Sequence, residues 1–199
     1  MKRVVIVHCW AGTPDSRWYP YAKRELEKAG FVVEIPAMPD TDMPRFDKWF
    51  NKLKEVAGIP NNNLYLVGHS LGGPIIMRYL QDLLAGTKIG GVVFVAVPTD
   101  TLDNVEAIED KSVLPEFFGS GINWQKVKEA GRKFIGIYSD NDPYIDLKHA
   151  EVLKNKVDAE IIYKHGLGHM SEPDGEGDVV IVKELPDVVD AIKKLTAST

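Results

Sequence analysis

The sequence predicts one α/β domain over residues 1–199, in which a mainly parallel sheet lies between two layers of helices. Three observations predict this fold class. Short β-branched or apolar runs alternate with longer amphipathic segments over the whole length of 199 residues. Most runs are apolar almost without interruption, as expected of parallel strands covered on both faces. The length suits a single core that buries about 70% of the extended-chain surface, so stability requires neither disulfides nor metals.

The strands are predicted from the apolar runs, and the helices from the amphipathic segments between them. In the helix that starts at Pro74, Ile75, Tyr79 and Leu80 recur at helical spacing, and Arg78 is left for the other face. The predicted strands are Val4–Val7, Phe31–Ile35, Leu64–Val67, Val92–Val97, Phe134–Tyr138 and Glu160–Tyr163. The predicted helices are Trp18–Ala29, Pro44–Val56, Pro74–Leu84, Trp124–Ala130, Ile145–Lys156 and Leu185–Leu195.

The segment 100–132 departs from this alternation. Its first part, Asp100–Gly121, is irregular and acidic, and it ends with Phe117 and Phe118 before a glycine-rich turn. A solvated excursion held in place by its aromatic residues is one interpretation. A small cap over a pocket is the other, since long connections in compact domains tend to be functional.

Composition excludes several classes of protein. With 24 Lys and Arg against 29 Asp and Glu, the net charge of -5 argues against a surface for nucleic acid or anionic lipid. Cys9 is the only cysteine, so no intramolecular disulfide is possible. The apolar run Val4–Val7 is too short for a signal peptide, and no stretch approaches the ~20 apolar residues of a spanning helix. We expect a cytoplasmic protein without nucleic-acid or membrane partners.

A serine between glycines stands where the third predicted strand passes into a helix. The residues Gly68-His69-Ser70-Leu71-Gly72 match G-x-S-x-G in the strand-turn-helix context that a nucleophile turn requires. Such a turn holds Ser70 in a sparsely allowed backbone region, and glycines at both ends prevent a collision between helix and strand. The N–H groups at the helix start, including that of Leu71, favour negative charge and supply half of an oxyanion hole. Because short matches also arise by chance, the interpretation depends on an acid and a histidine further along.

Both residue types follow later strands, in the order that this turn demands. Ser139-Asp140-Asn141-Asp142-Pro143-Tyr144 and His165-Gly166-Leu167-Gly168-His169 each come after a strand, and parallel strands end at one edge. Asp142 is the preferred acid because Pro143 holds it extended at the loop tip, whereas Asp140 suits a role in bracing the turn. His169 is the preferred base because two glycines let its loop fold back toward Ser70.

The other histidines have simpler interpretations. His165 is expected to lie fixed beside the sheet, His149 to be a surface residue of a helix, and His69 to point into packing. A metal site at His165 and His169 is disfavoured because the glycines between them oppose a helix. A calcium loop at Asp140 is disfavoured by Pro143 and by the lack of a glycine at its sixth position. We expect neither metal nor cofactor.

The strings GHSLGG, SDNDPYI and GLGHM, with VVIVHCWAG and IPAMPD, resemble the α/β-hydrolase superfamily. Within it, they resemble the compact retinoblastoma-binding protein 9-like serine hydrolases and their bacterial relatives. The resemblance spans nearly the whole chain and implies Ser70, Asp142 and His169 as a catalytic triad. It also implies the backbone N–H of Trp10 as second oxyanion donor, in a loop where Cys9 stands at a position often occupied by glycine. Binding to retinoblastoma-type proteins is not implied, because the chain has no Leu-x-Cys-x-Glu motif.

The expected function is hydrolysis of esters through an acyl-enzyme, with thioesters and small amides open to the same chemistry. A small, partly apolar substrate is expected if the aromatic residues line a pocket, although core packing is the simpler interpretation of each one. These residues are Trp10, Trp18, Phe117, Phe118 and Trp124. The alternative from another class is a non-catalytic α/β-hydrolase scaffold that binds proteins.

Overall fold

The computed structural model describes residues 1–101, 113–171 and 180–197. Six strands within these ranges form one sheet in the order β2-β1-β3-β4-β5-β6, and every neighbouring pair is parallel. The chain winds from β1 to β2 in one direction and from β3 to β6 in the other, so the direction changes between β1 and β3. The strands are β1 (Arg3–Val7), β2 (Val32–Glu34), β3 (Leu64–His69), β4 (Gly91–Val95), β5 (Phe134–Ser139) and β6 (Glu160–Lys164).

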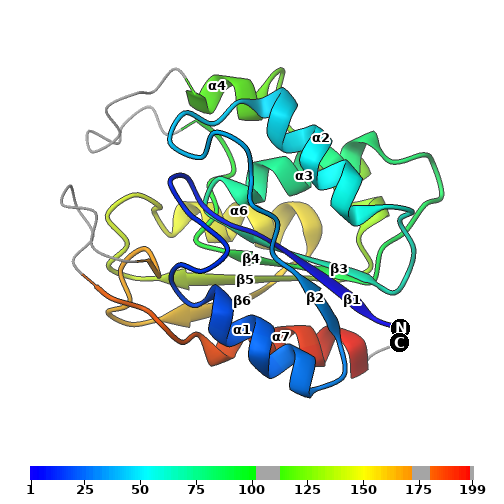
Figure 1. Cartoon of the computed structure of the whole chain (residues 1–199). Helices are drawn as coiled ribbons and strands as arrows, with labels where there is room; N and C mark the ends of the chain where they lie inside the picture. Colours follow the sequence, from blue (N-terminus) through cyan, green and yellow to red (C-terminus); the bar gives the residue numbers. More distant parts are fainter. Residues whose placement is uncertain (102–112, 172–179, 198–199) are drawn as a thin grey trace.

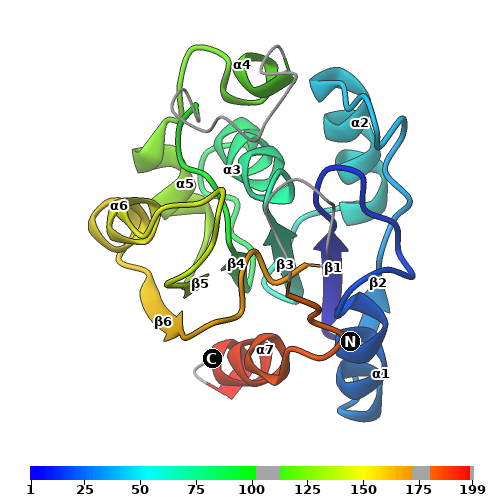
Figure 2. The same ribbon diagram turned by 90° about the vertical axis from the view of Figure 1, so that its left-hand side faces the viewer.

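Helices cover both faces of the sheet (Figures 1 and 2). Helices α1 and α7 pack on one face, and α2, α3, α5 and α6 pack on the other. The predicted three-layer α/β/α fold is therefore confirmed. None of the helices in the described part of the chain has the length and apolar character needed to cross a bilayer. The six helices expected from the sequence are α1 (Tyr19–Lys28), α2 (Phe46–Ala57), α3 (Gly72–Asp82), α5 (Trp124–Ala130), α6 (Lys148–Val157) and α7 (Pro186–Ala197).

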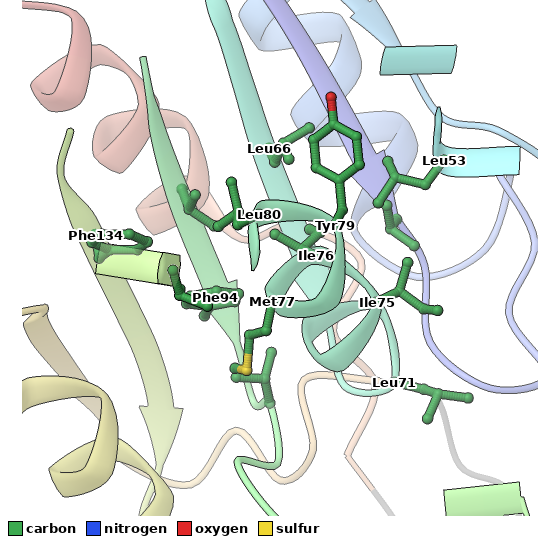
Figure 3. Close-up of a cluster of buried hydrophobic side chains, with 14 of the residues drawn as sticks. Leu53, Leu66, Leu71, Ile75, Ile76, Met77, Tyr79, Leu80, Phe94 and Phe134 are labelled. Atoms are coloured by element: carbon green, nitrogen blue, oxygen red, sulfur yellow. The ribbon is translucent and has the colours of Figure 1, made fainter. Parts of the chain in front are cut away.

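The strands in the middle of the sheet are buried on both faces, which explains their uninterrupted apolar sequences. Every residue of β3 and β4 is buried. Figure 3 shows how Ile76 and Leu80 of α3 pack near Leu66 of β3 and Phe94 of β4. By contrast, β6 lies at the sheet edge and is only half-buried. The central position of β3 and α3 gives the turn between them a rigid support.

The structure corrects one expectation about the segment 100–132. Residues 102–112 lie outside the described residues, but Val113–Phe118 forms a short helix, α4, where an irregular segment was predicted. The ring of Phe117 is fully buried, 5.7 Å from that of Trp49 and 6.1 Å from that of Phe46 on α2. Glu116 also pairs with Arg45 at 3.0 Å. These tertiary contacts stabilise a helix that is too short to form on its own.

Candidate active site

The turn between β3 and α3 places Ser70 at the carboxyl end of the central strands. Ser70 has a φ of 50°, in the left-handed region that only a few non-glycine residues adopt. Its backbone N–H donates to the carbonyl of Val95 at 2.9 Å, and its own carbonyl accepts from Gly73 N–H at 2.8 Å. The serine is thus held by main-chain bonds to β4 and to the first turn of α3, in the strained conformation expected from the sequence.

The two glycines that flank the serine permit the close approach of helix and strands. A Cβ atom at Gly72 would lie 2.4 Å from the carbonyl oxygen of Val7 on β1. A Cβ atom at Gly68 would lie 2.8 Å from the carbonyl oxygen of Gly72. Both distances are far below van der Waals contact, so only glycine fits at either position without displacing backbone. The start of α3 consequently lies directly against the end of β1.

We expect Gly72→Ala to lower the free energy of unfolding by about 3 kcal/mol, because the added methyl group meets rigid backbone. Gly30→Ala is the matched control. Gly30 has a positive φ, 87°, which Gly72 does not have, and no atom lies within 4 Å of its would-be Cβ. Its substitution should cost about 1 kcal/mol from backbone conformation alone. Urea denaturation of both variants measures the difference, and equal losses would show that the close approach at Gly72 is unimportant.

The acid and the base preferred from the sequence are in direct contact. His169 Nδ1 lies 2.8 Å from Asp142 Oδ2, and the two side chains are only 9% and 1% exposed. The other carboxylate oxygen, Oδ1, accepts from the backbone N–H groups of Tyr144 at 2.9 Å and Ile145 at 3.0 Å. Because an ionised carboxylate only accepts, Nδ1 of His169 carries the proton. The imidazole therefore presents Nε2 on the side away from Asp142.

A ladder of side-chain acceptors holds the loop that carries His169. The side chains of the last residue of β5 and of the two residues that follow it accept hydrogen bonds, at 2.8 to 3.1 Å. The donors are the backbone N–H groups of three consecutive residues after β6. The Asp142–His169 contact continues the same ladder by one residue. Each side chain of the sequence Ser-Asp-Asn-Asp thus fixes one position of the base loop. The pairs are Asp140 with Gly166, Ser139 with Leu167, and Asn141 with Gly168.

The second choices of acid and base, Asp140 and His165, pair with each other at the surface. The side chain of His165 is 95% exposed, so the expectation that it lies fixed beside the sheet is wrong. Its hydrogen bond lowers the pKa of Asp140 and raises its own pKa. Asp140 braces the turn, as the sequence suggested. In the ranges that the structure describes, no three His, Cys, Asp or Glu side chains cluster as metal ligands.

The loop after β1 and the start of α3 contain the two backbone N–H groups that the sequence suggests as oxyanion donors, those of Trp10 and Leu71. Among the described residues, no acceptor pairs with the backbone N–H of Trp10 or of Leu71. The neighbouring N–H of Cys9 is already donated to the hydroxyl of Tyr19 at 3.1 Å. Cys9 itself is 3% exposed, with its thiol against Gly12, so its side chain points into the interior. The loop therefore accommodates a side chain where glycine is common.

His69 connects the serine to the base loop. The residue is fully buried, and its Nε2 donates to the carbonyl of His169 at 2.9 Å. The rings of His69 and His169 lie 5.2 Å apart. Since Ser70 follows His69 directly, this bond ties His169 to the candidate nucleophile. The expectation that His69 is buried is confirmed, but both its ring nitrogens form hydrogen bonds.

His149 is not the surface residue expected from its helix. It is 1% exposed at the start of α6, and its Nδ1 accepts from Thr99 N–H at 3.2 Å. The hydroxyl of Thr99 lies 2.9 Å from the same nitrogen. Thr99 belongs to the loop after β4, so His149 fastens α6 to that loop. No local sequence signal distinguishes this role from an exposed helical position.

Buried histidines predict that the protein loses stability in acid. Burial lowers the pKa of His8, His69 and His149 from the usual value of 6.5. The unfolded chain therefore binds more protons than the folded chain once the pH falls below about 6.5, and the free energy of unfolding decreases from there. We expect His149→Asn, which keeps an acceptor for Thr99 but does not titrate, to lose less stability between about pH 7.5 and pH 5.5 than the wild type.

Thermal unfolding at a series of pH values measures this loss. His165→Asn is the control, because the pKa of His165 is raised rather than lowered. A folded-state pKa above the unfolded value stabilises the protein below that pH, so removing His165 should not reduce the loss in acid. An unchanged acid sensitivity of His149→Asn would count against burial of a neutral His149 as a cause.

The aromatic residues proposed from the sequence do not gather in one pocket. Trp18 packs with α1 on one face of the sheet, whereas Phe117 packs with α2 and α3 on the other. Both are fully buried, and Phe118 is 4% exposed, so these three are core residues. Trp10 and Trp124 are partly exposed. The indole N–H of Trp10 donates to the carbonyl of Asp42 at 3.0 Å. This bond fixes the ring of Trp10, which belongs to the candidate oxyanion loop.

Comparison with known proteins finds serine hydrolases and other proteins of the same fold. YdeN of Bacillus subtilis (strain 168) is 29% identical over 185 residues, which is 92% of this chain and 94% of that protein. The crystal structure of the B. subtilis ydeN gene product superposes with a TM-score of 0.86 at 27% identity and covers 99% of this chain and 100% of that one. The serine hydrolase RBBP9 of Rattus norvegicus is 21% identical over 169 residues, 84% of this chain and 86% of that protein.

More distant structures share the fold alone. Est1E from Butyrivibrio proteoclasticus, with ferulic acid bound, has a TM-score of 0.70 at 13% identity and covers 100% of this chain and 89% of that one. The resemblance to α/β-hydrolases and to the retinoblastoma-binding protein 9-like group is confirmed by these matches. The model of the family described as serine hydrolase matches residues 4–185, a range that contains every loop discussed above. The chain therefore belongs to the serine hydrolase family.

Proposed function

We propose that this hydrolase cleaves esters of modest size through a Ser70-His169-Asp142 triad and an acyl-enzyme. The buried contact between Asp142 and His169 carries the proposal. The loop that carries His169 is also hydrogen-bonded to His69, the residue before Ser70. A protein-binding scaffold without catalysis would need neither this buried pair nor a serine in a strained turn at the same edge of the sheet.

The reaction begins with attack of Ser70 Oγ on the ester carbonyl carbon, while His169 Nε2 takes the hydroxyl proton. Asp142 holds the ring through Nδ1–H and stabilises the imidazolium that forms. When the tetrahedral intermediate collapses, the bond to the leaving alkoxide breaks, and His169 returns the proton to it. Water then attacks the acyl-enzyme in the same way, and the acid and Ser70 are released.

The negative oxygen of the tetrahedral intermediate requires donors that are already in place. The backbone N–H groups of Trp10 and Leu71 fit this role, because neither has an acceptor in the described part of the chain. Leu71 also stands at the N-terminus of the 11-residue helix α3, whose dipole favours negative charge there. Each such donor contributes about 100- to 1000-fold to the rate in comparable sites.

Partly exposed aromatic rings support a substrate that is partly apolar. Trp10 lies in the oxyanion loop, and the Tyr144 ring packs edge-on at 5.1 Å from the ring of His169. Aromatic surface of this kind favours apolar acyl or alcohol groups. We assign α4, in the described part of segment 100–132, to a small cap of the same domain, whereas α5 belongs to the helical layer on the sheet.

A serine-directed fluorophosphonate tests the proposed reaction class. We expect the native protein to form a covalent adduct on the peptide that contains Ser70, because only an activated serine reacts at a useful rate. Mass spectrometry locates the adduct, and Ser70→Ala and heat-denatured protein are the controls. The absence of an adduct on Ser70 of the native protein would favour the non-catalytic scaffold instead.

A further inference from the structure

Two buried titratable side chains, Tyr19 and His69, have no part in the reaction described above. Both are fully buried, Tyr19 as the first residue of α1 and His69 as the last residue of β3. Their side chains contact each other, with the Tyr19 hydroxyl 2.7 Å from His69 Nδ1. A buried polar pair costs free energy unless each group finds partners, so its presence beside Ser70 requires an explanation.

The direction of each hydrogen bond in this pair is fixed by chemistry. The carbonyl of His169 can only accept, so His69 Nε2 carries the proton that it donates at 2.9 Å. Burial holds the pKa of His69 well below its usual range and that of Tyr19 well above, so both groups are neutral. In the neutral ring Nδ1 is an acceptor, and it receives the Tyr19 hydroxyl proton. The Tyr19 oxygen in turn accepts the backbone N–H of Cys9 at 3.1 Å.

These bonds form a continuous path between two parts of the candidate site. One end is the main chain of Cys9, next to the candidate oxyanion donor Trp10. The other end is the main chain of His169, and the residue in the middle, His69, is covalently joined to Ser70. The loop of His169 has a second tie to the same region, because Arg17 Nε donates to Ser171 Oγ at 2.7 Å.

We propose that Tyr19 and His69 are positioning residues that hold the oxyanion loop and the base at fixed places relative to Ser70. Asp142 is hydrogen-bonded to the ring of His169, and His69 is hydrogen-bonded to the main-chain carbonyl of His169. The inference rests on the proposed function, since it assigns these residues to that reaction. A displacement of about 1 Å can cost about 100-fold in rate, so loss of either tie should slow catalysis without removing any reacting group.

Kinetics of four variants with p-nitrophenyl butyrate test the proposal. We expect Tyr19→Phe and His69→Leu to lower kcat by about 10- to 100-fold and to change KM by less than about twofold, because substrate contacts remain intact. His69→Gln should recover most of the lost kcat, since its amide N–H can reach the carbonyl of His169 as Nε2–H does. Tyr65→Phe, which changes a buried tyrosine at the opposite end of β3, should retain wild-type kcat.

Wild-type kcat in folded Tyr19→Phe and His69→Leu would overturn the inference, as would a His69→Gln variant no faster than His69→Leu. The rate of fluorophosphonate labelling separates this failure from failure of the proposed function. If the wild type is not labelled at Ser70, the proposed function fails; if the wild type and Tyr19→Phe are labelled equally fast, only the positioning role fails.

Nitrogen NMR of the wild-type histidines adds a readout that does not depend on activity or on the folding of any variant. We expect the Nε2–H tautomer of His69 throughout the range in which the protein is folded. The Nδ1–H tautomer would contradict the hydrogen-bond path, because Nδ1 could then not accept from Tyr19.

Discussion

Replacement of Ser70 by alanine is expected to lower kcat for ester hydrolysis by about five to six orders of magnitude, as loss of the nucleophile does in comparable triads. The residual rate would come from the oxyanion donors and from substrate binding, which the substitution leaves in place. The same variant should form no fluorophosphonate adduct. Steady-state assays with p-nitrophenyl butyrate, at enzyme concentrations high enough to detect the residual rate, measure the loss.

Folding of the Ser70→Ala variant must be checked separately, because position 70 has a φ of 50°. Serine and alanine both carry a Cβ atom and experience similar strain there, so we expect a melting temperature close to that of the wild type. Gly72→Ala, in contrast, should unfold more easily. A folded Ser70→Ala protein that keeps more than about a tenth of the wild-type kcat would place the nucleophile elsewhere.

The sheet and the six main helices were predictable because their signals are local. A short uninterrupted apolar run such as Leu64–Val67, with turn residues on both sides, favours a strand covered on both faces, and the spacing of Ile76 and Leu80 is helical. Helix α4 was missed because its stability comes from distant residues. Phe117 packs against Trp49 and Phe46, and no pattern within Val113–Phe118 reveals those contacts.

The candidate site divides in the same way. The position of Ser70 follows from its flanking glycines and from the strand and helix around it. The loop of His169 could be placed at the right edge of the sheet because parallel strands end together. The role of His149 was missed because Thr99, its partner, is 50 residues away in the sequence. The contact of His69 with Tyr19 is hidden for the same reason, although a polar residue at the end of an otherwise apolar strand is a signal that merits attention.

Asp142→Asn is expected to lower kcat by about 10,000-fold, because the amide can donate to Nδ1 of His169 and favours the wrong tautomer of the ring. Oδ1 of Asp142 also accepts from two backbone N–H groups, and an asparagine can preserve these bonds only by turning its NH2 group toward His169. That orientation leaves Nε2 protonated and unable to accept the proton of Ser70. Replacement of one atom therefore disables the base while the fold remains intact.

Asp140→Asn is the matched control, two residues away on the same loop. Asp140 contacts exposed His165 and the N–H of Gly166, and an asparagine keeps an oxygen for the latter bond. We expect kcat to fall by less than about 10-fold, because surface ion pairs contribute little and the remaining rungs of the ladder still hold the base loop. Assays of both variants at several pH values distinguish the two carboxylates. A larger loss of kcat in Asp140→Asn than in Asp142→Asn would make Asp140 and His165 the working pair. The exposure of both side chains at the surface argues against that assignment.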